Sequence, residues 1–442
     1  MFNSLHTVAP AALLALSALP SALAQGYSID SDDAIRETAR TLAYDMMLFY
    51  EGNKTGMIPG ILPGPPADGK GDYYWWQGGA MMGTYVDYWH LTGDTSYNDV
   101  VREGMVHQVG DNRDYMPLNH TASLGNDDQG FWGMTAMLAA ENKFPDPPED
   151  QPQWLALAQA VWSTQNDRFD DHCNGGLRWQ AVSTNAGYNY KNTIANGCFF
   201  NIGARLARYT RNDTYTKAAE ETWDWLWGVN YIDHENWRVY DGGHIEHNCT
   251  DINKGHLLLQ HCRADAGAAF MYNYTETPSG STVSRSCWTA ALPISSREGY
   301  MHRWLAVVTQ LVPGTASKIL PVLQNSTQAA IRQCTGGASG RVCGFYWDRG
   351  EFIDPAVDKT TGAGEQMNVL AAVSSLLIAG ANPPTTNDTG GTSRGDSNAG
   401  RDSNPFQDPE PITTADRAGA GIVTFIILAS GLSSWYWMSF WD

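Results

Sequence analysis

The chain has 442 residues, and its 47 acidic and 28 basic side chains give a formal net charge of −19. This negative charge excludes a nucleic-acid binder that works through a basic face. Hydrophobic residues make up 43% of the chain, which excludes a wholly disordered protein. Charged residues are only 17%, whereas 17 Trp and 20 Tyr are present. We therefore expect an uncharged-polar, aromatic surface that suits neutral, hydroxyl-rich ligands.

The first 24 residues have the pattern of a secretory signal peptide. They are apolar from Val8 to Leu19 and end in Ala22-Leu23-Ala24, a small-x-small cleavage pattern. A transmembrane anchor is the alternative, although this apolar run is too short to span a bilayer. We predict that residues 1–24 are removed during secretion.

The far end of the chain has the pattern of a glycosylphosphatidylinositol (GPI) anchor signal. Residues 381–416 are rich in Pro, Thr, Asn, Ser, Gly and Asp, which predicts a disordered stalk, and 417–442 form a nearly uncharged hydrophobic terminus. Small residues at Asn398-Ala399-Gly400 place the attachment near Asn398. A retained transmembrane helix is the alternative, but no basic stop-transfer cluster is present. We predict a cell-surface protein, anchored by a GPI lipid at the plasma membrane or in the cell wall.

Cysteines and glycosylation sites agree with a secreted route. Seven N-x-[ST] sequons are present, and the seven cysteines should mostly pair in an oxidising compartment, leaving one odd thiol. Cys334 and Cys343 flank a Gly-rich turn and are the best candidate pair. The spacing of the other cysteines leaves their pairing open.

Apolar residues between positions 30 and 380 follow the helical period. Over 33–50, Ile35, Ala39, Leu42, Met46 and Phe49 fall on one face. The same spacing predicts helices over 75–91, 97–110, 129–141, 153–168, 197–210, 215–231, 255–273, 298–312, 317–333 and 365–380. The segments come in pairs, no run predicts hairpin-linked strands, and no sequence repeat supports a solenoid. We predict one all-α domain over 25–380, a closed toroid of helical hairpins whose long loops form the site at one rim.

Two adjacent carboxylates at Asp127-Asp128 precede a predicted helix and are flanked by Gly125 and Gly130. One interpretation is a helix N-cap, because a carboxylate satisfies the free N–H groups and the helix dipole. One aspartate suffices for that, however. Two like charges side by side raise the pKa of one group, as an acid/base partner of an ionised nucleophile requires. The pair is the strongest catalytic candidate.

A second pair, Asp170-Asp171, follows a predicted helix C-terminus and precedes Cys173. Carboxylates there are unfavourable to the helix dipole. We interpret this loop as structural or sugar-contacting rather than catalytic.

Four clusters of aromatic and amide residues lie at predicted loop-to-helix junctions, at 72–79, 188–197, 237–242 and 364–368. Aromatic rings stack on the apolar face of a sugar, and amides and carboxylates bind its hydroxyls. Taken one at a time, Trp and Tyr are more often core residues. Together the clusters favour a shared sugar cleft, and the candidate substrate contacts are Tyr74, Trp75, Trp76, Asn126, Gln129, Lys191, Asn192, Asn196, Asp241 and Gln366.

Metal or cofactor chemistry has little support. His244-x-x-His247 lies near Glu246 and Cys249, but Cys249 is expected to be in a disulfide. Lys191 is expected to pair with a carboxylate or hydroxyl rather than to form a Schiff base. No nucleotide-binding glycine loop occurs, so we predict no cofactor and no metal.

With these motifs the chain resembles glycoside hydrolase family 76, and within it the fungal GPI-anchored mannan endo-1,6-α-mannosidases of the cell wall. The resemblance covers about residues 30–380 and is most specific at 75–79, 125–129, 190–197 and 364–366. It implies an (α/α)6 barrel, activity on α-1,6-linked mannose and a retaining mechanism. Asp127 matches the nucleophile and Asp128 the general acid/base.

The resemblance also implies a substrate. Fungal members of this type are thought to cut the mannose core of GPI anchors and to join the released proteins to wall glucan. The leading hypothesis is therefore a transglycosidase with an α-mannoside donor and a β-glucan acceptor. A purely hydrolytic endo-α-1,6-mannanase is the alternative, since cleft shape and water exclusion select the acceptor. A carbohydrate-binding wall protein without turnover is a hypothesis of another class, which the intact Asp127-Asp128 pair disfavours.

Overall fold

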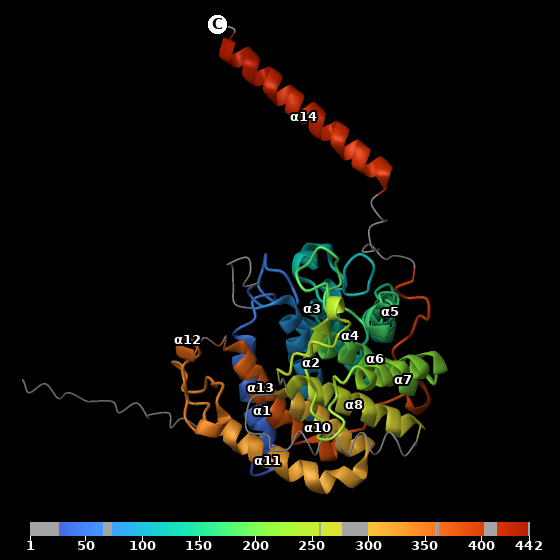
Figure 1. Ribbon diagram of the computed structural model, residues 1–442. Helices are drawn as coiled ribbons and strands as arrows, with labels where there is room; N and C mark the ends of the chain where they lie inside the picture. The colour runs from blue at the N-terminus through green and yellow to red at the C-terminus, as the bar shows by residue number, and fades with distance from the viewer. Residues whose placement is uncertain are drawn as a thin grey trace, which may run out of the picture.

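The computed structural model describes residues 26–64, 73–255, 258–275, 299–358, 360, 362–401 and 413–440. The predicted signal peptide lies outside these residues. Helices dominate the described chain (Figure 1). They are α1 (Asp32–Met47), α2 (Trp75–Thr92), α3 (Asn98–His107), α4 (Asn126–Glu141), α5 (Trp154–Asn166), α6 (Thr193–Thr210), α7 (Asp213–Gly228), α8 (Leu258–Thr275), α10 (Gly299–Leu311), α11 (Ala316–Arg332), α12 (Pro355–Asp358), α13 (Ala363–Ser375) and α14 (Thr414–Phe440).

Each of the eleven predicted helices is present, with ends within five residues of the expected ones. On α1, Ile35, Ala39, Leu42 and Met46 are buried as predicted, because this helix packs one face on the barrel. Helix α4 is instead buried on nearly all sides, since it lies inside the ring.

Six helices, α2, α4, α6, α8, α10 and α13, form a closed inner ring, in which each packs against the next and α13 returns to α2. Helices α1, α3, α5, α7 and α11 pack outside it. Residues 276–298, which precede α10, lie beyond the described residues. This alternation confirms the (α/α)6 barrel. Because every inner helix is the second of its hairpin, the inner helices all begin at the same end of the barrel.

One small antiparallel sheet lies at that end, where the sequence predicted no strand pairing. Strand β1 (Tyr190–Asn192) pairs with β2 (Gly242–His244). The predicted disulfide Cys334–Cys343 is present, and Cys173–Cys249 joins the 170–176 loop to the segment after β2. The side chains of Cys262 and Cys287 lie outside the described part of the chain.

The expected disordered stalk differs from the structure over residues 382–401, which we call the strap. Ser393 is buried, and its hydroxyl accepts a hydrogen bond from the Leu155 N–H in the first turn of α5. The Thr385 N–H donates to the Glu141 carbonyl at the end of α4. Both helix groups lack partners within their own helices. The polar strap residues therefore satisfy helix ends, which composition alone could not reveal.

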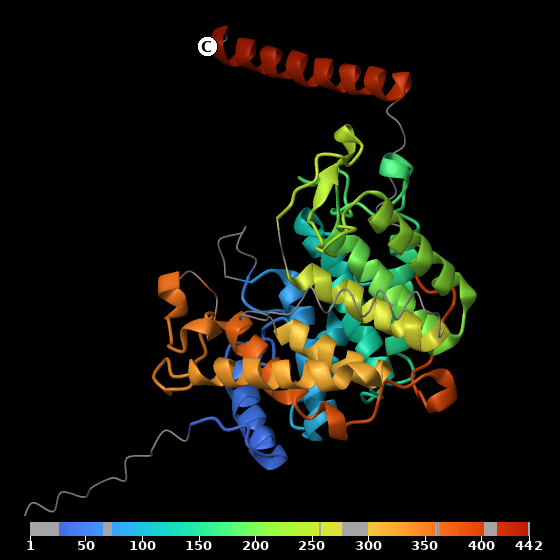
Figure 2. The same ribbon diagram turned by 60° about the horizontal axis from the view of Figure 1, so that its bottom comes forward.

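Beyond the strap, α14 extends away from the barrel (Figures 1 and 2), and nearly all of its described side chains are exposed. Within the described chain it is the one helix that is long and apolar enough to cross a membrane, over residues 417–434.

Candidate active site

The predicted site clusters gather at the end of the barrel where the inner helices begin. The residues at 72–79 lead into α2, those at 125–129 begin α4, those at 188–197 begin α6 and those at 364–368 lie in the first turns of α13. The prediction of a site at one rim therefore agrees with the fold.

The first turn of α4 holds the two aspartates in different ways. Gly125 is the N-cap, and its N–H donates to Asp128 Oδ2 at 2.7 Å, so Asp128 closes a capping box. Asp127 Oδ2 instead accepts a hydrogen bond from the Trp179 indole N–H at 3.1 Å. The capping interpretation thus applies to Asp128 alone. Asp127 is held by a side chain from another loop.

The Asp128 carboxyl has a pKa well above its ordinary value. Burial is the main cause, the neighbouring Asp127 carboxyl adds to it, and the Gly125 N–H opposes it. A carboxyl in this state keeps its proton where an ordinary aspartate has lost it. The pair thus offers a proton on Asp128 next to the Asp127 carboxylate.

Gly125 provides the space for both carboxylates. A Cβ atom there would lie 2.2 Å from Asp127 Oδ1 and 3.0 Å from Asp128 Oδ2. The φ of Gly125 is −90°, which any residue adopts. A glycine is therefore needed for room rather than for backbone conformation.

Aromatic side chains from the start of α2 lie beside the pair. Trp76 stacks on Phe131, with ring centroids 4.4 Å apart, and Phe131 follows Asp127 by one helical turn. Trp75 is nearly buried, and it stacks on His120 and donates its indole N–H to Gln108. Tyr74 is 47% exposed at the rim. Of the three, Tyr74 and the half-buried Trp76 can touch a ligand, whereas Trp75 is mainly a support.

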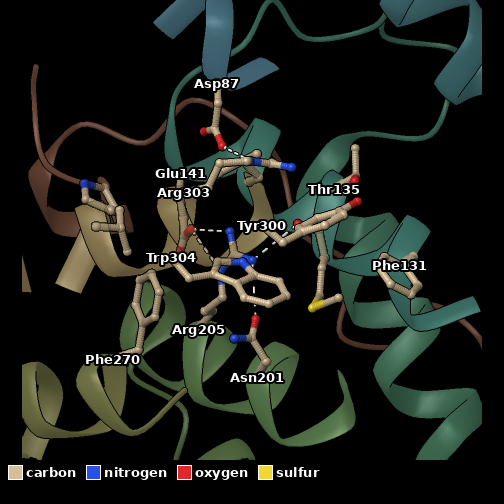
Figure 3. A pocket seen from close by; sticks show the side chains of 14 residues that line it. Asp87, Phe131, Thr135, Glu141, Asn201, Arg205, Phe270, Tyr300, Arg303 and Trp304 are labelled. Carbon is tan, nitrogen blue, oxygen red and sulfur yellow. Dashed lines mark hydrogen bonds and ion pairs between the residues drawn. The ribbon is translucent and has the colours of Figure 1, made fainter. Parts of the chain in front are cut away.

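The barrel interior beyond Phe131 is nearly closed. Figure 3 shows the residues that line a small cavity there, in which Arg205 pairs with Glu141 and Arg303 with Asp87. The Arg205–Glu141 distance is 2.6 Å, and Glu141 lies at the opposite end of α4 from the aspartates. The cavity volume of about 40 Å³ holds only a few water molecules. A substrate must therefore approach Asp127 and Asp128 from the rim.

Backbone hydrogen bonds connect the aspartates to the small sheet. The Asn126 N–H donates to the Trp179 carbonyl at 2.8 Å, and the Trp179 N–H donates to the Tyr190 carbonyl at 2.7 Å. Tyr190 begins β1, and its hydroxyl donates to Asp241 Oδ2, just before β2. These segments form one wall at the rim.

Six of the predicted substrate contacts are buried and bonded inside the protein, which disagrees with a direct contact. Lys191 is one of them, and its ammonium donates to Asp170 Oδ1 at 2.7 Å and to the carbonyls of His172, Gly175 and Gly176. Its pairing with a carboxylate was expected. The six are Asn126, Gln129, Lys191, Asn192, Asn196 and Gln366. Amide and lysine side chains near a helix start serve as caps and loop anchors as readily as sugar ligands.

Asp170 is structural, as one interpretation of the second pair proposed. It accepts hydrogen bonds from both Lys191 and Arg178. Burial works to raise its pKa, but these two cations outweigh it and hold the pKa below the ordinary value. Asp171 is exposed on the same loop.

Two residues that the sequence did not single out position the aspartates. Trp179 bonds Asp127, and Arg168 donates from Nε to the Asn126 amide oxygen at 2.8 Å. Arg168 is partly buried, and desolvation lowers the pKa of its guanidinium to about 10. Neither residue lies in an aromatic-amide cluster. Contacts across more than 40 positions bring them to α4, and local spacing carries no sign of that.

The structure gives His244 a partner other than a metal, because its Nδ1 lies 2.7 Å from Asp251 Oδ2. Within the described ranges, no group of three or more His, Cys, Asp or Glu side chains is arranged to hold an ion.

A helical barrel with two adjacent carboxyls at an aromatic rim is typical of glycoside hydrolases, and comparison with known proteins agrees. The sequence profile of Glycosyl hydrolase family 76 matches residues 34–292 and 284–388. The chain belongs to this family and is a glycoside hydrolase.

Similar proteins come from fungi and bacteria. Mannan endo-1,6-alpha-mannosidase DCW1 of Saccharomyces cerevisiae is 38% identical, over 93% of this chain and 94% of its own length. A crystal structure of Dfg5 from Chaetomium thermophilum in complex with glucosamine is 63% identical, with a TM-score of 0.82 over 85% of this chain and 97% of that one. The GH76A alpha-1,6-mannanase of Salegentibacter shares the fold at 14% identity, with a TM-score of 0.62 over 78% of this chain and 99% of that one.

Proposed function

We propose that the protein is a retaining endo-α-1,6-mannosidase in which Asp127 is the nucleophile and Asp128 the general acid/base. The observation that carries this proposal is the raised pKa of Asp128 beside Asp127 at the start of α4. Family membership and the name of the DCW1 relative support the α-1,6-mannan substrate.

In the first step, the Asp127 carboxylate attacks the anomeric carbon while the Asp128 carboxyl gives its proton to the leaving glycosidic oxygen. A covalent mannosyl-Asp127 ester forms as the glycosidic bond breaks. In the second step, Asp128 removes a proton from an incoming hydroxyl, whose oxygen displaces Asp127 from the anomeric carbon. Trp179 orients the nucleophile through its indole N–H, and Tyr74, Trp76 and Asp241 are the rim residues suited to binding mannose units.

The incoming hydroxyl decides between hydrolysis and transfer. We infer a sugar hydroxyl of β-glucan as acceptor and the mannose core of a GPI anchor as donor. The names of the relatives DCW1 and DFG5 support an α-1,6-mannoside donor, and the glucosamine in the complex of Dfg5 supports an amino sugar in that donor, as in the GPI core. The exposed apolar helix α14 supports a GPI signal, with attachment near Asn398 on the exposed part of the strap and a location at the plasma membrane or cell wall.

The test compares Asp127→Asn and Asp128→Asn with Asp171→Asn, an exposed aspartate of the second pair. Each purified variant receives α-1,6-mannotetraose and a β-glucan oligosaccharide, and products are identified by mass. We expect the first two variants to lose at least a thousandfold in kcat and Asp171→Asn to keep it. Full turnover by Asp127→Asn or Asp128→Asn would refute the assignment.

The same experiment separates the remaining hypotheses. Mannosylated glucan among the products of the parent protein supports a transglycosidase, and mannose oligomers alone support a plain hydrolase. A carbohydrate-binding wall protein would bind the tetraose in all variants and release no product in any of them.

A further inference from the structure

The strap leads the chain along the barrel toward the active-site rim. It begins beside the Glu141 carbonyl, at the end of α4 that lies far from the aspartates. It then bonds α5 in sequence order, because Ser393 meets Leu155 and the Asp396 N–H donates to Gln159 at 2.7 Å. Helix α5 is antiparallel to α4, so later residues of α5 lie nearer the aspartates.

The strap ends close to the level of the first turn of α4. A Cβ on Gly400 would lie 2.6 Å from the Ala160 carbonyl and 3.0 Å from Thr164. The Thr164 hydroxyl accepts a hydrogen bond from Gln129, one residue after Asp128. The chain therefore leaves the folded domain at its active-site end. Figures 1 and 2 agree, since α14 lies beyond this end in both views.

Little chain is available to carry the barrel away from its anchor. Attachment near Asn398, as proposed above, removes the chain that follows, so the anchor is joined directly to the end of the strap. An anchored protein thus keeps its active-site end near the bilayer, and a short tether gives an effective concentration in the millimolar range.

Exposed apolar side chains gather at the same end. Outside α14, seven large apolar side chains of the described chain are exposed, and five of them lie on the connections that lead into α2 and α4. Four of the five are aliphatic: Leu48 directly after α1, with an exposure of 64%, and Met57, Ile58 and Leu118, with exposures of 46%, 48% and 58%. A flat aromatic ring suits sugar stacking, whereas an exposed aliphatic side chain has no such use.

The last three of these side chains flank the Trp75 side of the site. The Pro59 carbonyl accepts a hydrogen bond from Gln108, which also accepts the Trp75 indole N–H, and Ile58 directly precedes Pro59. On the other side, His120 stacks on Trp75, two residues after Leu118.

We propose that Met57, Ile58 and Leu118 form a lipid-docking rim that turns the active site toward the membrane in which the protein is anchored. The inference rests on the proposed GPI anchor and extends it. A docked rim selects donors that stand on the same bilayer, such as a membrane-borne α-1,6-mannoside. Only weak lipid affinity is needed, because the anchor already confines the domain.

The test uses the full-length anchored protein in phosphatidylcholine vesicles. The variant is Met57→Ser/Ile58→Ser/Leu118→Ser, and the matched control is Tyr44→Ser, which replaces a 56% exposed side chain within α1. Turnover is measured on a lipid-linked α-1,6-mannoside in the same vesicles and on soluble α-1,6-mannotetraose. We expect the triple variant to lose about three- to tenfold on the lipid-linked donor only, and the control to lose nothing on either.

A second readout does not depend on turnover. A fluorophore on Leu118→Cys should be quenched by nitroxide-labelled lipid, and the same label on Tyr44→Cys should not. Equal losses on both substrates would assign the three residues to sugar binding, and an unquenched Leu118 label would overturn the docking. Absence of turnover on the soluble tetraose in the parent protein would contradict the proposed function instead.

Discussion

The two pairs of adjacent aspartates differ in the partners that the fold gives them. Asp170 is clamped by two cations, Lys191 and Arg178, which hold its pKa below the ordinary value. Asp128 receives a backbone N–H from Gly125 and lies beside Asp127, and its pKa is raised well above the ordinary value. In the Asp170-Asp171 pair the surroundings thus favour the ionised form of Asp170. In the Asp127-Asp128 pair they favour the protonated form of Asp128.

This difference separates a structural carboxylate from one suited to proton transfer. A buried charge that only holds a loop together is neutralised by a fixed countercharge. A group that must gain and lose a proton needs an environment in which the neutral form is favoured. Replacing the partners of Asp170 should therefore lower the free energy of unfolding, whereas replacing the partners of Asp127 and Asp128 should lower kcat.

The largest effect after loss of the catalytic pair is expected for Lys191→Met. The substitution removes the cation that binds Asp170 and leaves the carbonyls of His172, Gly175 and Gly176 without this donor. Asp170 keeps Arg178 as a partner, so the main cost is the lost donor, about 1–3 kcal/mol of unfolding free energy for each buried carbonyl left unsatisfied. Urea titration measures the loss, and kcat per folded molecule should hardly change. Lys217→Met, on an exposed pair with Glu221, should stay within about 0.5 kcal/mol; equal stability of the two variants would contradict the clamp.

Gly125→Ala should act on turnover more than on stability. The added Cβ would lie 2.2 Å from Asp127 Oδ1, so the carboxylates must shift. A displacement of about 1 Å in a catalytic group costs roughly a hundredfold in rate. Steady-state kcat on α-1,6-mannotetraose provides the measurement. Gly228→Ala is the control, because a Cβ there meets nothing within 4 Å and kcat should be unchanged. If Gly125→Ala keeps its kcat, the space around Asp127 is not critical.

Much of the fold could be predicted because the barrel helices carry their own periodicity. Ile35, Ala39, Leu42 and Met46 mark the buried face of α1 without reference to any other segment. The strap could not be predicted in this way. Ser393 is an ordinary polar residue of a low-complexity segment, and only its distant partner at Leu155 shows that it is ordered. Composition indicates whether a segment tends to fold by itself. It does not show that the segment can form hydrogen bonds with backbone groups at the ends of distant helices.

The site shows the same division. Asp127 and Asp128 stand out locally, because two carboxylates exceed what one helix start requires. The hydrogen bond from Trp179 to Asp127 and the pairing of Lys191 with Asp170 join segments that are distant in the sequence. The spacing of residues along the chain does not predict such contacts. The aromatic-amide clusters lie at the end of the barrel where α4 begins, but their buried amides and lysine hold loops together.

Trp179→Phe tests the partner of Asp127 with a smaller change. Phenylalanine keeps an aromatic ring at this position but lacks the indole N–H that donates to Asp127 Oδ2. A hydrogen bond to a charged group is worth about 1.5 kcal/mol or more, so kcat should fall about tenfold. Trp227→Phe is the control, since this ring stacks on His234 far along the chain from α4. A rise in KM with an unchanged kcat would assign Trp179 to substrate binding instead.

The smallest effect, the pH dependence of stability, should have opposite signs for the two pairs. Below about pH 4, the Asp128 carboxyl is protonated in both the folded and the unfolded protein and contributes nothing. As the pH rises, the unfolded chain releases this proton first, because the folded pKa is raised. Asp128 therefore lowers the free energy of unfolding more and more as the pH rises toward neutral. Asp128→Asn keeps an oxygen acceptor for the Gly125 N–H, so its Tm should rise by a few degrees relative to that of the parent between pH 4 and pH 7.

For Asp170 the folded pKa is lowered, so its stabilisation is present at neutral pH and is lost as the pH falls. Asp170→Asn should then lose Tm relative to the parent at pH 7 and approach it only as the pH falls well below about 4, toward about pH 2, where the carboxyl becomes protonated in both states. Calorimetric scans of the two variants and the parent between these pH values measure both differences. Slopes of the same sign would mean that the two pairs are electrostatically alike, and the distinction between a clamped and a proton-holding aspartate would fail.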